Sequence, residues 1–226
     1  MLELLQQWFP YVMKKPDQFF KSIVETLVMT AWSGVFMFVL GMILGVALTT
    51  TREGGVWENR PVFQVLDKVI NLFRSIPFVI LIALLMNVSK FVMGTRIGVK
   101  GVIVPLVVGA SPFFARQVDA ALCGVDRGLI EAARSMGLSP LQIIFRVYLR
   151  EGRAAIARGT TITLINLVGL TAMSGYVGAG GLGDYAITYG YNYNRMDIVW
   201  ASVITIVILV SIIQAVGTLI ARKSTH

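Results

Sequence analysis

Three long stretches without a charged residue limit the folds open to this chain more than any other feature. They are residues 26–51, 159–183 and 198–221. Each is longer than the roughly 20 apolar residues that a helix needs to cross a hydrocarbon core about 30 Å thick. Only 14% of the residues are charged, against about 25% in ordinary globular domains. The sequence therefore predicts an all-α integral membrane protein.

Two shorter apolar stretches, 75–89 and 101–115, are separated by Lys90, Arg96 and Lys100. Each is long enough to cross a membrane only if the flanking basic side chains extend their charged ends to the interface. A re-entrant hairpin is the alternative. With two spans here, we predict five transmembrane helices, near residues 22–50, 69–92, 97–116, 155–177 and 198–221.

The distribution of lysine and arginine predicts which loops face the cytoplasm, because cytoplasmic loops are enriched in both. Residues 116–158 contain seven arginines, the densest basic stretch of the chain. Placing this stretch inside puts the C-terminus in the cytoplasm and, with five spans, the N-terminus outside. Lys14, Lys15 and Lys21, ahead of the first span, argue against an outside N-terminus.

Cytoplasmic arginines and anionic lipid headgroups already account for the net charge of +8, so we expect no nucleic-acid partner.

These features divide the chain into three parts. Residues 1–22 carry an apolar stripe that is typical of a helix lying in the membrane interface. Residues 23–221 form a single transmembrane domain, which includes a cytoplasmic loop at 123–153. Residues 222–226 form a cytoplasmic tail.

The sequence offers few residues for metal, disulfide or catalytic chemistry. Cys123 is the single cysteine, which excludes an internal disulfide and a cysteine-rich metal cluster. His226 is the single histidine and is terminal. The sequence contains no G-x-x-x-x-G-K-[ST] segment, the loop that cradles ATP phosphates in P-loop ATPases. We expect this chain to bind no cofactor and not to be an enzyme.

The segment EAARSMGLSPLQIIFRVYLREG, residues 131–152, interrupts this apolar chain with two short amphipathic helices. Asp126 is a suitable N-cap for the first helix. Gly137 is placed to end that helix in a left-handed conformation. Ser139 and Gln142 form a capping box at the start of the second helix, where Pro140 occupies the first turn. The pattern predicts a helix, a tight turn and a second helix.

Both helices of this segment carry an apolar stripe at helical spacing. A unit too short to span must lay these stripes against the membrane surface, the ends of the protein's own helices, or a soluble partner. The pattern alone leaves a connecting surface element and a docking element equally open. The stripes are Leu129, Ala132, Ala133 and Met136 in the first helix and Leu141, Ile144, Phe145, Tyr148 and Leu149 in the second.

The segment resembles the EAA loop in permease subunits of bacterial ABC importers of type I, whose pattern is Glu-Ala-Ala-x-x-x-Gly, nine residues, then Ile/Val-x-Leu-Pro. Val147 and Leu149 fall at the expected offsets, whereas Arg150 stands where the pattern has proline. Because proline would end the helix there, we expect the second helix to run further, to about Gly152. The residues that match the pattern are Glu131, Ala132, Ala133 and Gly137.

Four further segments are similar to the methionine-uptake (MetI-like) permease family: FRSIPFVILIALL at 73–85, and residues 94–122, 128–143 and 177–191. The resemblance implies a homodimer in the bacterial inner membrane, two cytoplasmic ATPase subunits that use ATP and Mg, and an extracytoplasmic substrate-binding protein or lipoprotein. It implies uptake of methionine by alternating access; a different sulfur-containing amino acid is the main alternative. A secondary transporter or a membrane scaffold would be a different class, but the chain shows no internal repeat.

The resemblance also implies roles for individual residues. Glu131 would face the ATPase and Gly137 would form the turn, while Arg134 and Arg146 would either pair with the ATPase surface or be solvated. Met173 and Asn166, with Ser174 nearby, are candidates for the pathway or gate, although helix packing explains them equally well. The predicted coupling residues are Glu131, Ala132, Ala133, Gly137, Leu138, Ser139 and Pro140, and those predicted to face the binding protein are Gly178, Gly180, Gly181, Gly183 and Tyr189.

Overall fold

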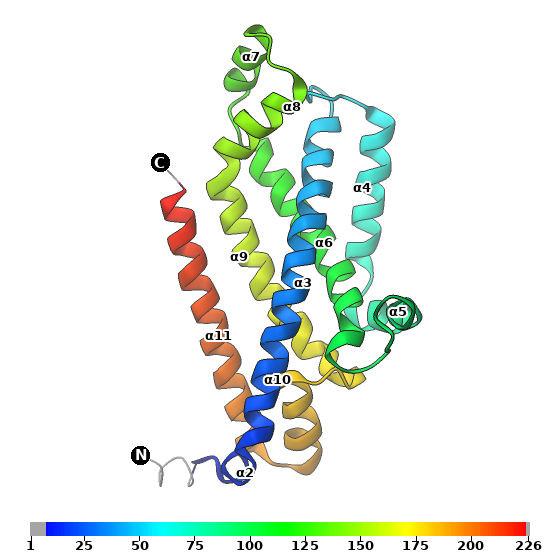
Figure 1. Ribbon diagram of the computed structural model, residues 1–226, viewed down its shortest axis with the longest axis vertical. Helices are drawn as coiled ribbons and strands as arrows, with labels where there is room; N and C mark the ends of the chain where they lie inside the picture. The colour runs from blue at the N-terminus through cyan, green and yellow to red at the C-terminus, as the bar shows by residue number, and fades with distance from the viewer. Residues whose placement is uncertain (1–7, 225–226) are drawn as a thin grey trace. The chain divides into compact units, whose positions relative to one another are not determined.

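The computed structural model describes residues 8–224, and over this range it is helical, without a strand (Figure 1). Residues 1–7, part of the predicted interfacial segment, lie outside the described range, as do 225–226 of the predicted tail. The helices are α2 (Pro10–Lys14), α3 (Pro16–Thr51), α4 (Arg60–Ser75), α5 (Phe78–Met93), α6 (Gly98–Cys123), α7 (Arg127–Ser135), α8 (Pro140–Ile143), α9 (Leu149–Ser174), α10 (Gly181–Asp184) and α11 (Met196–Lys223).

Four helical segments are long and apolar enough to cross a membrane: α3, α6, α11 and the segment Pro140–Val177 that contains α9. The prediction of one continuous helix at 69–92 is wrong. The chain breaks at Ile76 and Pro77, and α4 and α5 meet at an angle of 107° there. Pro77 disfavours helical backbone at the preceding residue, and Ile76 is extended (φ −80°, ψ 124°). The count is five spans if this bent pair forms one.

The chain divides into two compact units. We call the first the glycine-loop unit; it comprises Met1–Val35, Pro77–Val107 and Leu164–Ile213. The second, the corner unit, comprises Phe36–Ile76, Val108–Thr163 and Gln214–His226.

In the corner unit, α3 packs closely on α6 because two of its residues have no side chain. A Cβ atom on Gly41 would lie 2.6 Å from the Phe114 ring, and one on Gly45 would lie 2.5 Å from the Val118 Cβ. Small residues four apart let two membrane helices approach closely. A buried cluster of Leu48, Ile70 and Ala115 then joins α3, α4 and α6, with Leu44, Phe63 and Leu66 packed against it.

In the glycine-loop unit, the N-terminal residues pack against the segment that follows α10. Val12 of α2 is buried with Tyr185, Ile198 and Ala201. The backbone N–H of Tyr11 donates to the Asp197 carboxylate at 2.8 Å. Helix α3 begins at Pro16, so the predicted boundary near residue 22 falls inside a helix.

Candidate functional site

The predicted helix–turn–helix at residues 126–148, which we call the corner, is present and its caps are formed. The Asp126 carboxylate accepts from the backbone N–H of Gly128 at 2.7 Å. The Ser139 N–H donates to the Gln142 side chain at 2.9 Å, and the Gln142 N–H donates to the Ser139 hydroxyl at 3.4 Å. This reciprocal pair is the predicted capping box.

The turn between the two helices depends on Gly137. This residue has φ +78°, in the left-handed region that favours glycine. The Gly137 N–H donates to the Arg134 carbonyl at 2.9 Å, and the Leu138 N–H donates to the Ala133 carbonyl at 3.1 Å. These two bonds form a Schellman motif, which satisfies the last carbonyls of α7.

The second helix does not end near Gly152, so that prediction is wrong. Helix α8 passes into a π-helical turn at Ile144–Tyr148 and then directly into α9, which continues to Ser174. Arg150, unlike the proline of the family pattern, retains a backbone N–H and can continue the helix. The corner is therefore joined to a membrane-spanning helix without a break in the helical backbone.

The apolar residues of the corner form two sets rather than one stripe on each helix. The first set is buried and attaches the corner to its own unit: Ile130, Ala133, Ile143, Ile144 and Tyr148. The second set is exposed: Leu129, Met136, Leu141 and Phe145. The exposed fractions reach 71% for Met136 and 67% for Phe145. Burial divides both predicted stripes, because Leu129 and Met136 are exposed while Ala133 is buried, and Phe145 is exposed while Tyr148 is buried.

The remaining predicted coupling residues divide between these surfaces. Glu131, Ala132 and Ser139 are exposed, and Leu138 and Pro140 are half-buried. The corner thus presents exposed apolar side chains together with exposed charged ones, which are Asp126, Arg127, Glu131, Arg134 and Arg146.

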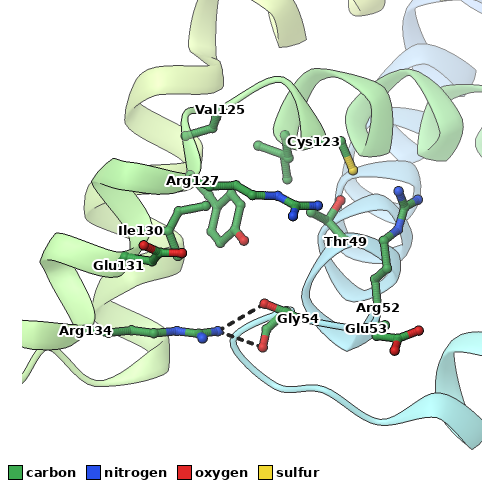
Figure 2. Close-up of a pocket in the computed structure, with 13 residues that line it drawn as sticks. Thr49, Arg52, Glu53, Gly54, Cys123, Val125, Arg127, Ile130, Glu131 and Arg134 are labelled. Atoms are coloured by element: carbon green, nitrogen blue, oxygen red, sulfur yellow. Dashed lines mark hydrogen bonds between the residues drawn. The ribbon is translucent and has the colours of Figure 1, made fainter.

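A pocket of about 310 Å³ lies beside the corner, within the corner unit. Figure 2 shows the Arg127 side chain extending from α7 across this pocket, towards Thr49 of α3. The lining residues are Thr49, Arg52, Glu53, Gly54, Gly55, Leu122, Cys123, Val125, Arg127, Ile130, Glu131, Arg134 and Tyr148.

Arg134 crosses from α7 to the loop between α3 and α4. One guanidinium nitrogen, Nη2, donates to the carbonyl oxygens of Gly54 at 3.3 Å and Gly55 at 2.8 Å (Figure 2). For Arg134 the sequence predicts either a contact with the ATPase or solvation. The contact with the α3–α4 loop was not predicted. Its acceptors are backbone atoms of distant residues, which no side-chain pattern reports.

A buried carboxylate, Asp119 of α6, holds the end of α3. It accepts from the Thr49 hydroxyl at 2.9 Å and from the Arg52 guanidinium at 2.8 and 3.1 Å. A second arginine, Arg116 of α6, is paired with Asp67 of α4. Buried carboxylates are retained where arginines and hydroxyls satisfy them. Charge pairs therefore connect α6 to both α3 and α4.

The predicted pathway residues in α9 do not share one environment. Asn166 is exposed and Met173 is 41% exposed. Their spacing of two helical turns places them on one face of α9. Ser174 is fully buried, and its hydroxyl donates to the Thr171 carbonyl at 2.7 Å. An amide side chain on the exposed face of an apolar helix is costly to bury in lipid, so this face is suited to a cavity or a protein neighbour.

The predicted glycine cluster forms a tight loop, residues 178–183, which we call the glycine loop. Gly178, Gly180 and Gly181 all have φ between +69° and +82°. Gly183 serves close packing instead, because a Cβ there would lie 2.1 Å from the Ala172 carbonyl oxygen.

Residues of α3 hold the glycine loop in place. The Gly181 N–H donates to the Glu25 carboxylate at 2.8 Å, and the Leu182 N–H donates to the Thr26 hydroxyl at 2.8 Å. Glu25 is not among the residues that the sequence predicts for this site. A pocket of about 300 Å³ lies beside this loop, lined by Gln18, Lys21, Ser22, Glu25, Gly98, Val99, Gly178, Ala179, Gly180, Gly181, Asp184, Tyr185 and Tyr189.

Two tyrosines complete the wall of this pocket. The ring of Tyr189 lies 5.6 Å from that of Tyr185. Burial, together with the nearby Asp197 carboxylate, raises the pKa of the Tyr185 phenol above its ordinary value. Tyr185 therefore remains a neutral group at physiological pH. Among residues 8–224, no cluster of three or more His, Cys, Asp or Glu side chains could hold a metal ion.

Comparison with known proteins gives consistent matches. Residues 37–225 match the family model described as "Binding-protein-dependent transport system inner membrane component". The chain is 43% identical, over 98% of its length and 97% of the relative's, to the probable D-methionine transport system permease protein MetI of Vibrio cholerae. It is 44% identical, over 97% of its length and 98% of the relative's, to the methionine import system permease protein MetP of Bacillus subtilis.

Solved structures agree with these sequence matches. A chain of the MetNI methionine ABC transporter in an inward-facing conformation superimposes with a TM-score of 0.90 at 43% identity, covering 92% of this chain and 97% of that one. A chain of an amino acid ABC transporter superimposes with a TM-score of 0.77 at 18% identity, covering 95% of this chain and 98% of that one. The second likeness shows the fold alone.

Proposed function

Because the chain belongs to the family of binding-protein-dependent transport system inner membrane components, we propose that it is the permease subunit of an ATP-driven importer for methionine. In this proposal two copies of the chain form the membrane core, and two separate ATPase subunits supply the work. An extracytoplasmic binding protein or lipoprotein delivers the amino acid. The family and the apolar helices place the chain in a bacterial inner membrane as a multi-pass protein.

The exposed apolar face of the corner is the observation that carries the coupling part of this proposal. Phe145 and Leu141 are exposed although both are large and apolar. The caps of α7 and α8 hold that face in a fixed shape. Amphipathic helices of this kind bind in grooves on soluble partners, and the sequence contains no ATP-binding loop of its own. The ATPase subunit, which uses ATP and Mg, is the partner that fits these facts.

The mechanism follows from the way the corner is connected. Closure of the ATPase pair around ATP would move the two docked corners towards each other. Because α8 continues into α9 without a break in the helical backbone, this movement would tilt a membrane-spanning helix directly. Tilting of that helix is a means of alternating access between the two sides of the membrane.

The substrate pathway in this proposal includes the exposed face of α9. Asn166 supplies a polar group and Met173 a soft apolar side chain, suited to contact with a thioether. The same face would meet the second copy of the chain. The glycine loop and Tyr189 would face the binding protein on the outer side, opposite a cytoplasmic corner and C-terminus, with the N-terminus outside.

Reconstitution tests this function. We expect liposomes that contain the chain, its ATPase and its binding protein to accumulate radiolabelled methionine and to hydrolyse ATP faster when methionine is present. Homocysteine and cysteine in parallel reactions test the alternative of another sulfur-containing substrate. Purification of an active complex that lacks any ATPase would contradict the proposal and favour a secondary transporter or a scaffold.

A variant of the exposed face tests the docking surface separately. Phe145→Asp should reduce co-purification of the ATPase at least tenfold, because it places an unpaired charge in an apolar contact. Phe145→Leu keeps the apolar surface and is the matched control. Normal ATPase association of Phe145→Asp would show that this face is not the docking surface.

A further inference from the structure

The corner is connected to α3 and α4 by a side chain rather than by the chain itself. The covalent neighbours of the corner are α6, through residues 124–126, and α9, through the π-helical turn at Ile144–Tyr148. Helices α3 and α4 lie far away in sequence. Arg134 bridges this gap through its bonds to the carbonyl oxygens of Gly54 and Gly55.

The α3–α4 loop, to which Arg134 donates, is itself stabilised by backbone hydrogen bonds. The Gly55 N–H donates to the Arg52 carbonyl at 2.8 Å, and the Trp57 N–H donates to the Thr50 carbonyl at 3.0 Å. Gly55 tolerates no side chain, because a Cβ there would lie 2.2 Å from the Thr50 oxygen. A loop folded back on its own helix in this way moves with that helix.

The end of α3 is in turn fixed to α6. Arg52 and Thr49 both bind the carboxylate of Asp119. Arg116, also on α6, binds Asp67 of α4. A force applied at the Gly54–Gly55 peptide therefore reaches a block of three helices joined by charge pairs, rather than a free loop.

We propose that Arg134 is a mechanical strut that transmits displacement of α7 to the α3–α4 loop, and so to the α3, α4 and α6 block. This inference rests on the proposed coupling role of the corner. The strut works in parallel with the covalent route from α8 into α9. With both in place, displacement of the corner reaches α9 through the backbone and α3, α4 and α6 through Arg134.

The chemistry of arginine suits this task. Its planar guanidinium is always charged, and one nitrogen can donate to two carbonyl oxygens in a defined geometry. The Arg134 side chain is exposed, so its bonds add little to folding stability. Removing these bonds should therefore weaken the transmission of movement from α7 to the α3–α4 loop without unfolding the protein, so the strut can be tested by mutation.

The test compares Arg134→Met with Arg146→Met in the reconstituted complex with its ATPase and binding protein. Arg146 is an exposed arginine of the same corner, and no hydrogen bond or ion pair joins its side chain to another of residues 8–224. Three quantities are measured for each variant: the amount of ATPase that co-purifies, the rate of ATP hydrolysis, and the methionine taken up per ATP hydrolysed.

For Arg134→Met we expect assembly and ATP hydrolysis within about twofold of the unmodified complex and a fall in uptake per ATP of about fivefold, the most that an exposed charged contact is worth. Arg146→Met removes an equal charge from the corner without a contact to the α3–α4 loop, so an effect of charge on ATPase docking should appear in both variants and the fall in uptake per ATP in Arg134→Met alone. Arg134→Lys, which keeps the charge and can reach one carbonyl, should recover part of the loss. If Arg134→Met does not fold, Arg134→Lys carries the test with a two- to threefold fall.

Two results would overturn the strut. Unchanged uptake per ATP in Arg134→Met would mean that no force passes through this contact. Loss of the ATPase from the complex would mean that Arg134 binds the ATPase instead. Failure of the proposed function looks different, because then the unmodified complex itself would take up no methionine or contain no ATPase.

Discussion

The corner and the glycine loop are both tight turns that depend on glycine with positive φ, but they are stabilised in different ways. The corner is capped by its own residues: Asp126 caps α7, and Ser139 and Gln142 cap α8 three positions apart. The glycine loop is capped by residues 156 positions away, Glu25 and Thr26 of α3. A turn with local caps can keep its shape while the whole unit moves. A turn with distant caps is fixed to its surroundings.

This difference suits the proposed roles. A lever that docks on one subunit and moves others must stay rigid through the movement, which local caps allow. A surface that receives a binding protein gains from being held in place by the helix beneath it. The following predictions test that comparison, beginning with the largest expected effect.

Gly137→Val should abolish methionine uptake while the chain still inserts in the membrane. Valine is β-branched and is strongly disfavoured at the φ of +78° found here, so the Schellman turn should open and α8 should lose its direction. Uptake in liposomes and membrane fractionation measure the two effects. Gly137→Asn is the matched control, because asparagine tolerates the left-handed region, and it should retain most activity. Normal uptake by Gly137→Val would remove the corner from the mechanism.

Gly183→Ala should lower the free energy of unfolding by about 1–3 kcal/mol, the usual cost of overpacking. The added methyl group would lie 2.1 Å from the Ala172 carbonyl oxygen, a backbone atom that cannot swing away. Thermal unfolding in detergent measures the loss. Gly169→Ala is the control, since no atom lies within 4 Å of its Cβ position. Equal melting temperatures for both variants would show that the glycine loop is not tightly packed.

The smallest expected effect comes from removing one capping hydroxyl from each turn, and the two turns should respond differently. Ser139→Ala removes a local cap and should cost about 1 kcal/mol, confined to the first turn of α8. Thr26→Val removes the hydroxyl that accepts from the Leu182 N–H, at a similar cost of about 1 kcal/mol, but its effect should extend into α3. Amide hydrogen exchange distinguishes them. Unchanged exchange near Leu182 in Thr26→Val would contradict the distant capping of the glycine loop.

Several features of the site could be predicted because they depend on neighbouring residues. The caps at Asp126 and Ser139, and the left-handed Gly137, each require a particular residue within one helical turn. The break at Pro77 also has a local cause, but the apolar residues on both sides of it predict one continuous span.

The division of the corner's apolar residues into a buried and an exposed set was beyond the sequence. A regular helical period groups Phe145 with Tyr148, but the π-helical turn at Ile144–Tyr148 shifts the register of the second helix. Likewise, the sequence contains Arg134 and contains Gly54, but nothing in either segment brings them together.

The sequence by itself determined the class of this protein and the turn of the corner. Apolar stretches long enough to cross a membrane, and caps made between residues three apart, depend on residues that are neighbours in the sequence. Only the tertiary structure decided which side chains meet: Arg134 with the Gly54 and Gly55 carbonyls, Arg52 with Asp119, and Glu25 with Gly181. Such contacts join segments that are far apart along the chain, and they form only after packing has fixed the distance between helices.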